Sequence, residues 1–532
     1  GLDTYSGQFT RPAGAAASPA TYNLADFMLG LRSQYALTTF FVAQMRQDLH
    51  FTYLQDDVRV NDHLTANLGL RYEYATPFWE ANNVLTNFDP ATHTMITAKD
   101  GSMYDRALVD PDRNNFGPRL GLAYTVSPTT VIRGGWGLSY VHMNRIGSAN
   151  LLPINGPQVV RAVVAQGDAT APSFRPTEQG YPAGLTNPAA FNPIAANISY
   201  IPRDFHSSPV QSWYVSWQHE FEPRMLLDVA YVGNRADDLL LLANYNQAAP
   251  NNAAGTIPLQ SRRPISDFGD ITYVFNGGKS RYKALQVKYE WRPDRDLTLF
   301  NSLTLSKAED NSAGSLENQN GNFPAPQDLH NLDADFGLSG YHQPYNLSTS
   351  FVWTLPVGKG KRFGGDMSPA LDAIAGGWQL AGSNIWTPGE MVTLVYSPAA
   401  NFQVSSITND FWGANNYRPN LTCDPYAPKG QQSITNWFNG SCVSVPTDPS
   451  QPFGNAPRNN VRGPNYTEFD LAAIKQVKVS GESRAELRIE VFNLFNRVNF
   501  TPPASNRSVA TFGTITGTFP ARQVQLGVKF IW

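Results

Sequence analysis

The chain alternates apolar and polar residues along many short segments. From Leu64 to Tyr74, every even position is apolar or aromatic, and every odd position is Thr, Asn, Gly, Arg or Glu. Successive side chains of a β-strand point to opposite faces, so such a segment predicts a strand with one apolar and one polar face. The pattern predicts about fourteen strands. Besides 64–74, clear segments lie near 49–60, 116–126, 132–140, 213–221, 225–233, 285–291, 296–307, 345–355, 376–387, 467–479, 487–491 and 524–532.

The connections between these segments alternate strictly between short and long. The short ones are turns of a few residues at 61–63, 127–129, 222–224, 293–295 and 480–482. The long ones lie at 76–115, 141–208, 234–280, 308–344, 388–466 and 496–520, and the stretch 356–375 is the one turn longer than this rule predicts. A soluble β-sandwich or propeller would explain the side-chain alternation but not this asymmetry. The sequence therefore predicts an all-β fold, an antiparallel transmembrane β-barrel with short periplasmic turns and long extracellular loops.

Composition supports this fold class. Only 16% of the 532 residues are charged and 12% are aromatic, whereas about 25% are charged in a typical soluble domain. The longest aliphatic run, Leu239 to Ala243, is far shorter than the ~20 residues of a spanning helix. The net charge of −3 without a basic block excludes a nucleic-acid footprint.

Several segments resemble one family of outer-membrane proteins. Residues 54–73, 115–124, 131–137 and 458–471, and above all the run RAELRIEVFNLFNRVNF at 484–500, resemble barrel strands of TonB-dependent receptors of the Oar-like branch. Val58 stands where that family commonly has Trp. The last six residues, 527–532, resemble the aromatic-terminated signal of outer-membrane assembly.

The resemblance implies a location in the outer membrane of a Gram-negative bacterium and a function in transport. Its implied partners are outer-membrane lipid, a plug domain, the TonB system and an unidentified extracellular cargo. We expect residues 49–532 to be the C-terminal strands and loops of a larger barrel, and residues 1–48 to be an outer loop and leading segment. The plug is expected outside this chain. The rival hypothesis is a structural or adhesive surface barrel that binds polymers or cells without import.

Charged residues on the predicted strands fall on the polar parity. In lipid each would cost up to ~2–4 kcal/mol at mid-depth, so we expect them to face the lumen. There they would pair with each other across strands or contact the plug or cargo. These residues are Arg71, Glu73, Arg119, Arg133, Lys288, Glu290, Glu486, Arg488 and Glu490.

Candidate cargo contacts lie in the predicted outer loops, where aromatic rings stand beside amides. Such a surface suits a carbohydrate or a peptide, although an ordinary ordered loop has the same composition. Cys423 and Cys442 lie close together in one loop, which predicts a disulfide in an oxidising compartment; the alternative is two thiols. The cargo candidates are Phe411, Trp412, Asn415, Asn416 and Tyr417.

Strings that mimic catalytic motifs have no supporting context. The triplet 335–337 (DFG) lacks the other kinase motifs, and 358–361 (GKGK) lacks the P-loop spacing. The eight His residues show no metal-ligand spacing, and His330 beside Asp328, Asp333 and Asp335 lacks the order of a calcium loop. We therefore predict no enzymatic activity, no cofactor and no metal site.

Overall fold

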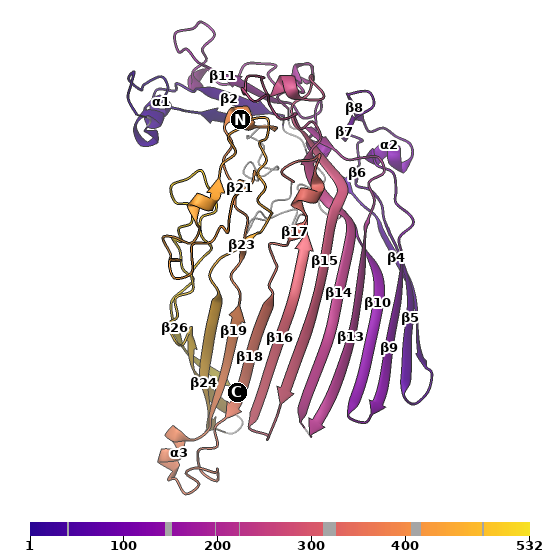
Figure 1. Ribbon diagram of the computed structural model, residues 1–532, viewed down its shortest axis with the longest axis vertical. Coiled ribbons are helices and arrows are strands. Elements are labelled where there is room, and N and C mark those ends of the chain that lie inside the picture. The colour runs from indigo at the N-terminus through magenta and orange to yellow at the C-terminus, as the bar shows by residue number, and fades with distance from the viewer. Residues whose placement is uncertain are drawn as a thin grey trace.

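In the computed structural model, one antiparallel sheet dominates the chain (Figure 1). The structure describes residues 1–16, 18–39, 42–143, 152–196, 198–222, 224–311, 326–405, 417–480 and 483–532. Thirteen strands follow one another in a continuous path that we call the wall. They are β4 (Leu49–Arg59), β5 (Leu64–Ala75), β9 (Phe116–Ser127), β10 (Thr130–Val141), β13 (Ser208–Glu222), β14 (Met225–Asn244), β15 (Ile271–Trp291), β16 (Leu297–Asp310), β18 (Tyr345–Thr354), β19 (Trp378–Thr387), β24 (Tyr466–Ser480), β25 (Ser483–Phe492) and β26 (Gln523–Ile531).

Every predicted strand segment lies in a strand of the wall, and the register confirms the predicted facing. Leu68 is opposite Leu120, Leu120 is opposite Trp136, and Trp136 is opposite Trp213. We call the side that carries these residues the apolar face. Its side chains are exposed, 48% for Leu68 and 75% for Leu526. An exposed apolar surface of this extent marks a membrane contact, so the apolar face is the lipid-facing side.

The wall is open in the described part of the chain. Its edge strands, β4 and β26, have no further partner strand among the described residues. Because neighbours are antiparallel and the path holds thirteen strands, the two edge strands run in the same direction. The predicted number of about fourteen strands compares with fifteen in this sheet, because β12 (Ile198–Tyr200) and β17 (Gly337–Leu338) pair with the wall from outside the path.

The predicted connection 234–280 is wrong in part, because β14 and β15 continue far beyond bilayer length. Their upper parts pair from Leu239 to Asn244, past a register shift at Ala236 to Leu240. Asp238 takes a φ of 56° there, and a Cβ on Gly278 would lie only 2.7 Å from Leu239 Cβ. The bulge ends the two-residue alternation, so the sequence pattern did not reveal the extension.

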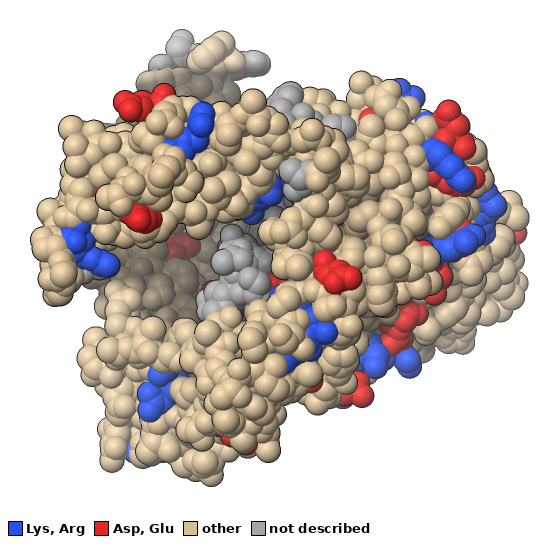
Figure 2. Space-filling view, turned by 90° about the horizontal axis from the view of Figure 1, so that it is seen from above, with Lys and Arg blue, Asp and Glu red and all other residues tan. Residues whose placement is uncertain are grey.

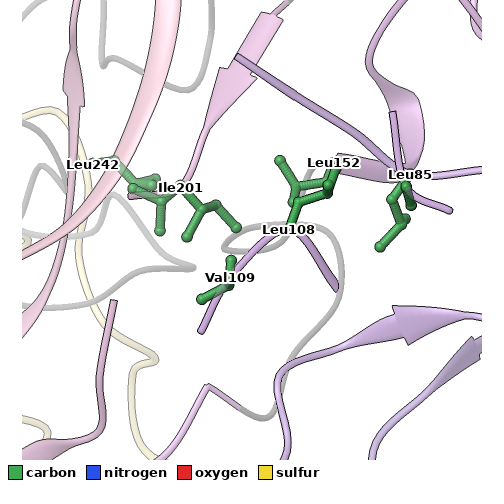
Figure 3. Close-up of a cluster of buried hydrophobic side chains, with 8 residues drawn as sticks. Leu85, Leu108, Val109, Leu152, Ile201 and Leu242 are labelled. Carbon is green, nitrogen blue, oxygen red and sulfur yellow. The ribbon is translucent and has the colours of Figure 1, made fainter. Parts of the chain in front are cut away.

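The packed core of the protein lies in the outer loops and the upper parts of β14 and β15. Leu85, Leu108, Leu152, Ile201 and Leu242 come from five separate segments and bury one another (Figure 3). Two further clusters centre on Phe88 with Ile271 and on Leu394 with Val461. The apolar residues of the loops and of the upper parts of β14 and β15 are therefore buried against each other, whereas those lower on the wall face outward.

Small elements occupy the two ends of the wall. Figure 1 shows the N-terminus among the loops, and the C-terminus and α3 at the end of the tight turns. The predicted long turn at 356–375 holds α3. The remaining strands are β1 (Leu2–Thr4), β2 (Gln34–Thr38), β3 (Met45–Arg46), β6 (Trp79–Glu80), β7 (Thr86–Asp89), β8 (Thr94–Thr97), β11 (Arg161–Ala165), β20 (Met391–Val392), β21 (Asn420–Leu421), β22 (Val443–Ser444) and β23 (Val461–Arg462).

Helical segments are short. Among the described residues, none is long and apolar enough to span a membrane. They are η1 (Pro19–Asn23), α1 (Leu24–Met28), α2 (Met103–Ala107), η2 (Leu152–Ile154), η3 (Thr177–Gln179), η4 (Pro188–Ala190), η5 (Gln260–Arg262), η6 (Leu332–Asp335), α3 (Pro369–Ala375), η7 (Ala400–Phe402) and η9 (Gly440–Cys442).

The facing of the wall predicts opposite results for two neighbouring substitutions. Leu68→Arg places a cation in lipid and should destabilise the assembled protein by about 2–4 kcal/mol. Asn67→Arg should be tolerated, because Asn67 lies on the polar face beside the Asp57 carboxylate. Heat-modifiability of the full-length protein in isolated outer membranes measures assembly. Equal tolerance of the two variants would contradict the assigned facing.

Candidate functional site

The polar face of the wall carries a broad hollow. Its volume is about 690 Å³, within the range of about 300–1,000 Å³ that ligand sites occupy. We call it the wall hollow. On the parity of the polar face it is lined by Gln55, Asn67, Gly69, Arg119, Gly121, Gly135, Gly137, Ser212, Tyr214, Val232, Asn234 and Tyr282. Leu68, Leu120, Trp136, Trp213 and Gly233 of the opposite parity complete the lining.

Glycines create the depth of the wall hollow. Gly69, Gly121, Gly135 and Gly137 lie on three neighbouring strands, β5, β9 and β10, and present no side chain. At Gly135 the ring of Tyr214 crosses the neighbouring strand so closely that a Cβ would lie 2.6 Å from Tyr214 Cε1. Glycine in a strand often marks such a close approach. The aromatic ring and the bare backbone together line the floor of the hollow.

Arg119 is the cation of the wall hollow. Its side chain stands above Gly69 and Gly137, with Arg119 Cγ 3.4 Å from the position of a Gly137 Cβ. In the described part of the chain, no carboxylate lies within ion-pair distance of Arg119. Asn234 Nδ2 donates to Ser212 Oγ at 2.9 Å nearby. A guanidinium among amides and hydroxyls can bind an oxygen-rich or anionic group through paired hydrogen bonds.

The other predicted lumen charges pair mainly along their own strand. Arg71 Nε lies 3.0 Å from Glu73 Oε1, and Arg488 Nε lies 2.6 Å from Glu486 Oε1. Arg488 also lies 3.5 Å from Glu490. The expected pairing across strands is therefore wrong for these residues. Side chains two residues apart share a face, and long Arg and Glu side chains close that gap without leaving their strand.

The remaining predicted lumen charges lie apart from the Arg71–Glu73 pair and from the pairs of Arg488. Glu290 pairs with Arg292 at the end of β15, and Arg133 donates to the Gln218 amide oxygen. Lys288 is exposed on the polar face. The nine predicted residues thus form several local groups, and the structure does not bring them together into one site.

His142 joins two outer-end segments above the wall. His142 Nε2 lies 2.9 Å from Glu73 Oε2, and His142 Nδ1 lies 2.7 Å from Ser207 Oγ. Such a Ser, His and Glu series has the polarity of a nucleophile with its base. However, the Ser207 backbone N–H donates to the Asp112 carboxylate at 2.9 Å, which places a negative charge where an acyl-transfer site needs an oxyanion donor. We assign the series a role in holding the loop to the wall.

Buried ion pairs fasten the loop assembly, and sequence reasoning missed them. Arg418 pairs with Asp335, and both side chains are only 3% exposed. Arg458 pairs with Asp310, and Arg263 lies 2.6 Å from Asp270. Arg418 also donates to the carbonyls of Ala456 and Ala334. Arg418 and Asp335 are 83 residues apart in the chain, so no local sequence pattern predicts their pairing.

The predicted cargo contacts fall at the edge of the described residues. Phe411, Trp412, Asn415 and Asn416 lie outside them. Tyr417 packs inside the loop assembly at 6% exposure, between the rings of Tyr396 and Phe453. Its hydroxyl accepts a hydrogen bond from Val404 N at 2.9 Å, and burial raises the pKa of Tyr417 to about 12.

The loop end presents a largely uncharged surface. Figure 2 shows only scattered Lys, Arg, Asp and Glu side chains on this face. Cys423 and Cys442 form a disulfide that closes the loop between them. A neutral, covalently closed loop surface favours recognition through hydrogen bonds and ring faces over steering by charge.

The buried Arg418–Asp335 ion pair predicts a large loss of stability when one partner is removed. Arg418→Met leaves the Asp335 carboxylate buried without its cation, which should destabilise the loop assembly by about 3–5 kcal/mol. Limited proteolysis of the full-length protein should then cut within 326–335 and 417–462. The control is Arg203→Met, whose pair with Asp110 is exposed and should contribute at most ~1 kcal/mol. Equal protease resistance of both variants would overturn this role.

His342 predicts a loss of stability in acid. It is buried, and burial together with the nearby Arg462 guanidinium lowers the pKa of His342. Its neutral Nδ1 accepts from Ala308 N at 3.3 Å. Because the unfolded chain binds the proton more readily, this stability is present above about pH 6.5 and is lost as pH falls below it.

Thermal unfolding at pH 7.5 and 5.5 tests whether His342 causes this loss of stability in acid. His342→Gln should lose less stability between the two pH values than the unchanged protein. His330→Gln is the control, because His330 is exposed, and it should show the full dependence. An unchanged pH dependence in His342→Gln would reject the assignment.

Three solved structures illustrate what this chain is similar to. The ferripyoverdine receptor FpvA of Pseudomonas aeruginosa, solved with heterologous pyoverdines, is 10% identical, with 91% of this chain and 38% of that chain covered and a TM-score of 0.43. The FrpB iron transporter of Neisseria meningitidis is 11% identical, with 92% and 46% covered and a TM-score of 0.42. The ferric citrate transporter FecA is 10% identical, with 92% and 45% covered and a TM-score of 0.41.

This chain spans less than half the length of these solved structures. A comparison with curated protein sequences found no match. The Oar-like branch stays a prediction. A family model described as an outer membrane beta barrel domain matches residues 1–525. The predicted location in the Gram-negative outer membrane is confirmed, and the chain belongs to the outer membrane β-barrel family.

Proposed function

We propose that this chain is the wall of a TonB-dependent receptor that takes up a cargo through the outer membrane. The observation that carries the proposal is the wall hollow, where the Arg119 guanidinium stands over a glycine floor on the polar face. Concave sites with a few converging polar groups are the usual form of a binding site. A surface that only adheres would need its outer loops and no such site along the wall.

Energy for import would come from parts of the receptor beyond the wall. The resemblance implies a plug domain and a TonB system, which we propose as partners. Residues 1–48 we propose to belong to an outer loop and leading segment. The remaining lumen charges, among them Lys288 and Arg133, would contact the plug or the cargo. The transport activity is therefore a property of the complete receptor.

The chemistry of the wall hollow favours a polar cargo. Asn67, Asn234, Tyr214 and Tyr282 supply amides, hydroxyls and ring faces, which suit a carbohydrate or a peptide. Arg119 adds a bidentate site for a carboxylate or phosphate. We propose a polar cargo of this class with at least one anionic group, first met by the neutral loop surface seen in Figure 2.

Uptake by cells that carry the complete receptor tests the proposal. Cells with and without the receptor gene would be grown on a mixture of oligosaccharides and peptides, and depletion of each compound would be followed by mass spectrometry. Receptor-dependent depletion should stop when an uncoupler removes the proton gradient. Binding without depletion, insensitive to the uncoupler, would instead support the adhesive barrel.

Arg119→Gln gives the sharper prediction. It removes one charge-assisted contact worth about 1.5–3 kcal/mol, so the uptake of an anionic cargo should fall about 10- to 150-fold at unchanged receptor abundance. Arg59→Gln is the matched control, because Arg59 lies exposed beside a tight turn at the opposite end from the loops. Unchanged uptake in Arg119→Gln would remove the wall hollow from the cargo route.

A further inference from the structure

Four cations stand together on the apolar face of the wall, where charges are otherwise rare. Lys283 on β15 is the register partner of Lys307 on β16, and Arg281 on β15 is the register partner of Arg235 on β14. We call Arg235, Arg281, Lys283 and Lys307 the cation cluster. Lys283 shares its face with Leu285, two residues further along β15, and Leu285 is exposed. The cation cluster is therefore continuous with the lipid-facing surface.

The cation cluster lies where the wall leaves the membrane. The segment from Lys283 to Trp291 at the periplasmic end of β15 spans nine residues, and a tilted strand needs about 9–11 residues to cross a bilayer. On other strands aromatic pairs lie toward the outer ends, Tyr72 with Phe116 and Tyr345 with Trp386. Such rings form the interfacial girdle of a barrel. Cations replace the girdle at β14 to β16.

The cluster holds more positive charge than its own carboxylates neutralise. Asp237 accepts from Arg235 at 2.7 Å and from Arg281 at 2.6 Å. Glu309 lies 2.6 Å from Lys307. Two carboxylates thus serve four cations, and Lys283, which is exposed, has no carboxylate within ion-pair distance among the described residues.

Like charges directly opposite each other on a sheet are unfavourable. Register partners hold their Cβ atoms about 4.5–5.5 Å apart, so Lys283 and Lys307 repel each other, and Glu309 offsets this only through its pair with Lys307. A multivalent anion at this point converts the repulsion into charge-assisted hydrogen bonds. The place of the pair, above the lipid-facing Leu285 and Leu305, determines which anion can reach it. Acyl chains would lie on these leucines while the headgroup meets the lysines.

We propose that the cation cluster binds a phosphate-bearing glycolipid of the outer leaflet, with its phosphate between Lys283 and Lys307. Arg281 and Arg235 extend the site toward the sugar or a second phosphate. The four cations have the opposite parity from Arg119 and Tyr214 of the wall hollow, so they point to the other side of the sheet. It would fix the receptor in the leaflet and strengthen the open upper part of β14 and β15.

Binding of defined lipids to the complete receptor in detergent tests the proposal. The probe is fluorescent bisphosphorylated lipid A, and the competitors are unlabelled lipid A, enzymatically dephosphorylated lipid A and inorganic phosphate. Only bisphosphorylated lipid A should displace the probe. Equal displacement by dephosphorylated lipid A would show that acyl chains alone bind, and displacement by inorganic phosphate at the same concentration would show a site for free phosphate. Either result overturns the proposal without any variant.

Substitutions locate the site. Lys283→Gln with Lys307→Gln should weaken binding of the probe about 30-fold, and Lys283→Arg with Lys307→Arg should retain it. Arg59→Gln with Lys361→Gln removes two exposed cations near the periplasmic turns and should leave binding unchanged. Heat-modifiability checks that each variant is assembled. Unchanged affinity in the doubly neutralised protein would reject the cation cluster as the site.

Discussion

Hydrocarbon offers no hydrogen-bond partner to a backbone amide, and this constraint governs the whole molecule. A chain without a spanning helix can cross lipid only as a sheet whose strands pair with each other. Pairing fixes the direction of every side chain, so each strand must alternate between a residue for lipid and a residue for water. The exposed Leu68 and Leu526 are thus not defects of packing. The bilayer takes the place that a second layer of protein takes in a soluble sheet.

This division moves the packed core away from the wall. The lower part of the wall gives its apolar side chains to lipid, so Leu85 and Leu152 of the loops are buried together with Leu242 from the upper part of β14. The loops lack a continuous sheet that would hold them in register, and buried ion pairs supply long-range connections instead. Arg418 joins segments 83 residues apart, and Arg458 joins segments 148 residues apart. Such pairs contribute little net stability but penalise every arrangement that separates them.

The wall could be predicted from the sequence because its signal is local. About ten residues of alternation are enough to predict each strand. The turns at 127–129 and 293–295 can likewise be predicted without knowing any distant contact. The upper parts of β14 and β15 were not predicted as strands, because Leu239 to Leu242 are all apolar and the bulge at Asp238 breaks the two-residue alternation. The ion pairs of the loops were not predicted, because no residue near Arg418 in the sequence indicates that Asp335 is its partner. Pairing along the strand, as in Arg71 with Glu73, depends on rotamers that the alternation does not determine.

The number of strands also limits how the wall can close. Thirteen consecutive antiparallel strands leave β4 and β26 running in the same direction, so joining these two edges would create a parallel pair. A second copy of the wall, placed side by side around a common axis, would again set β4 beside a parallel β26. A barrel with antiparallel neighbours throughout has an even number of strands. The thirteen described strands of the wall therefore cannot close on each other by antiparallel pairing alone.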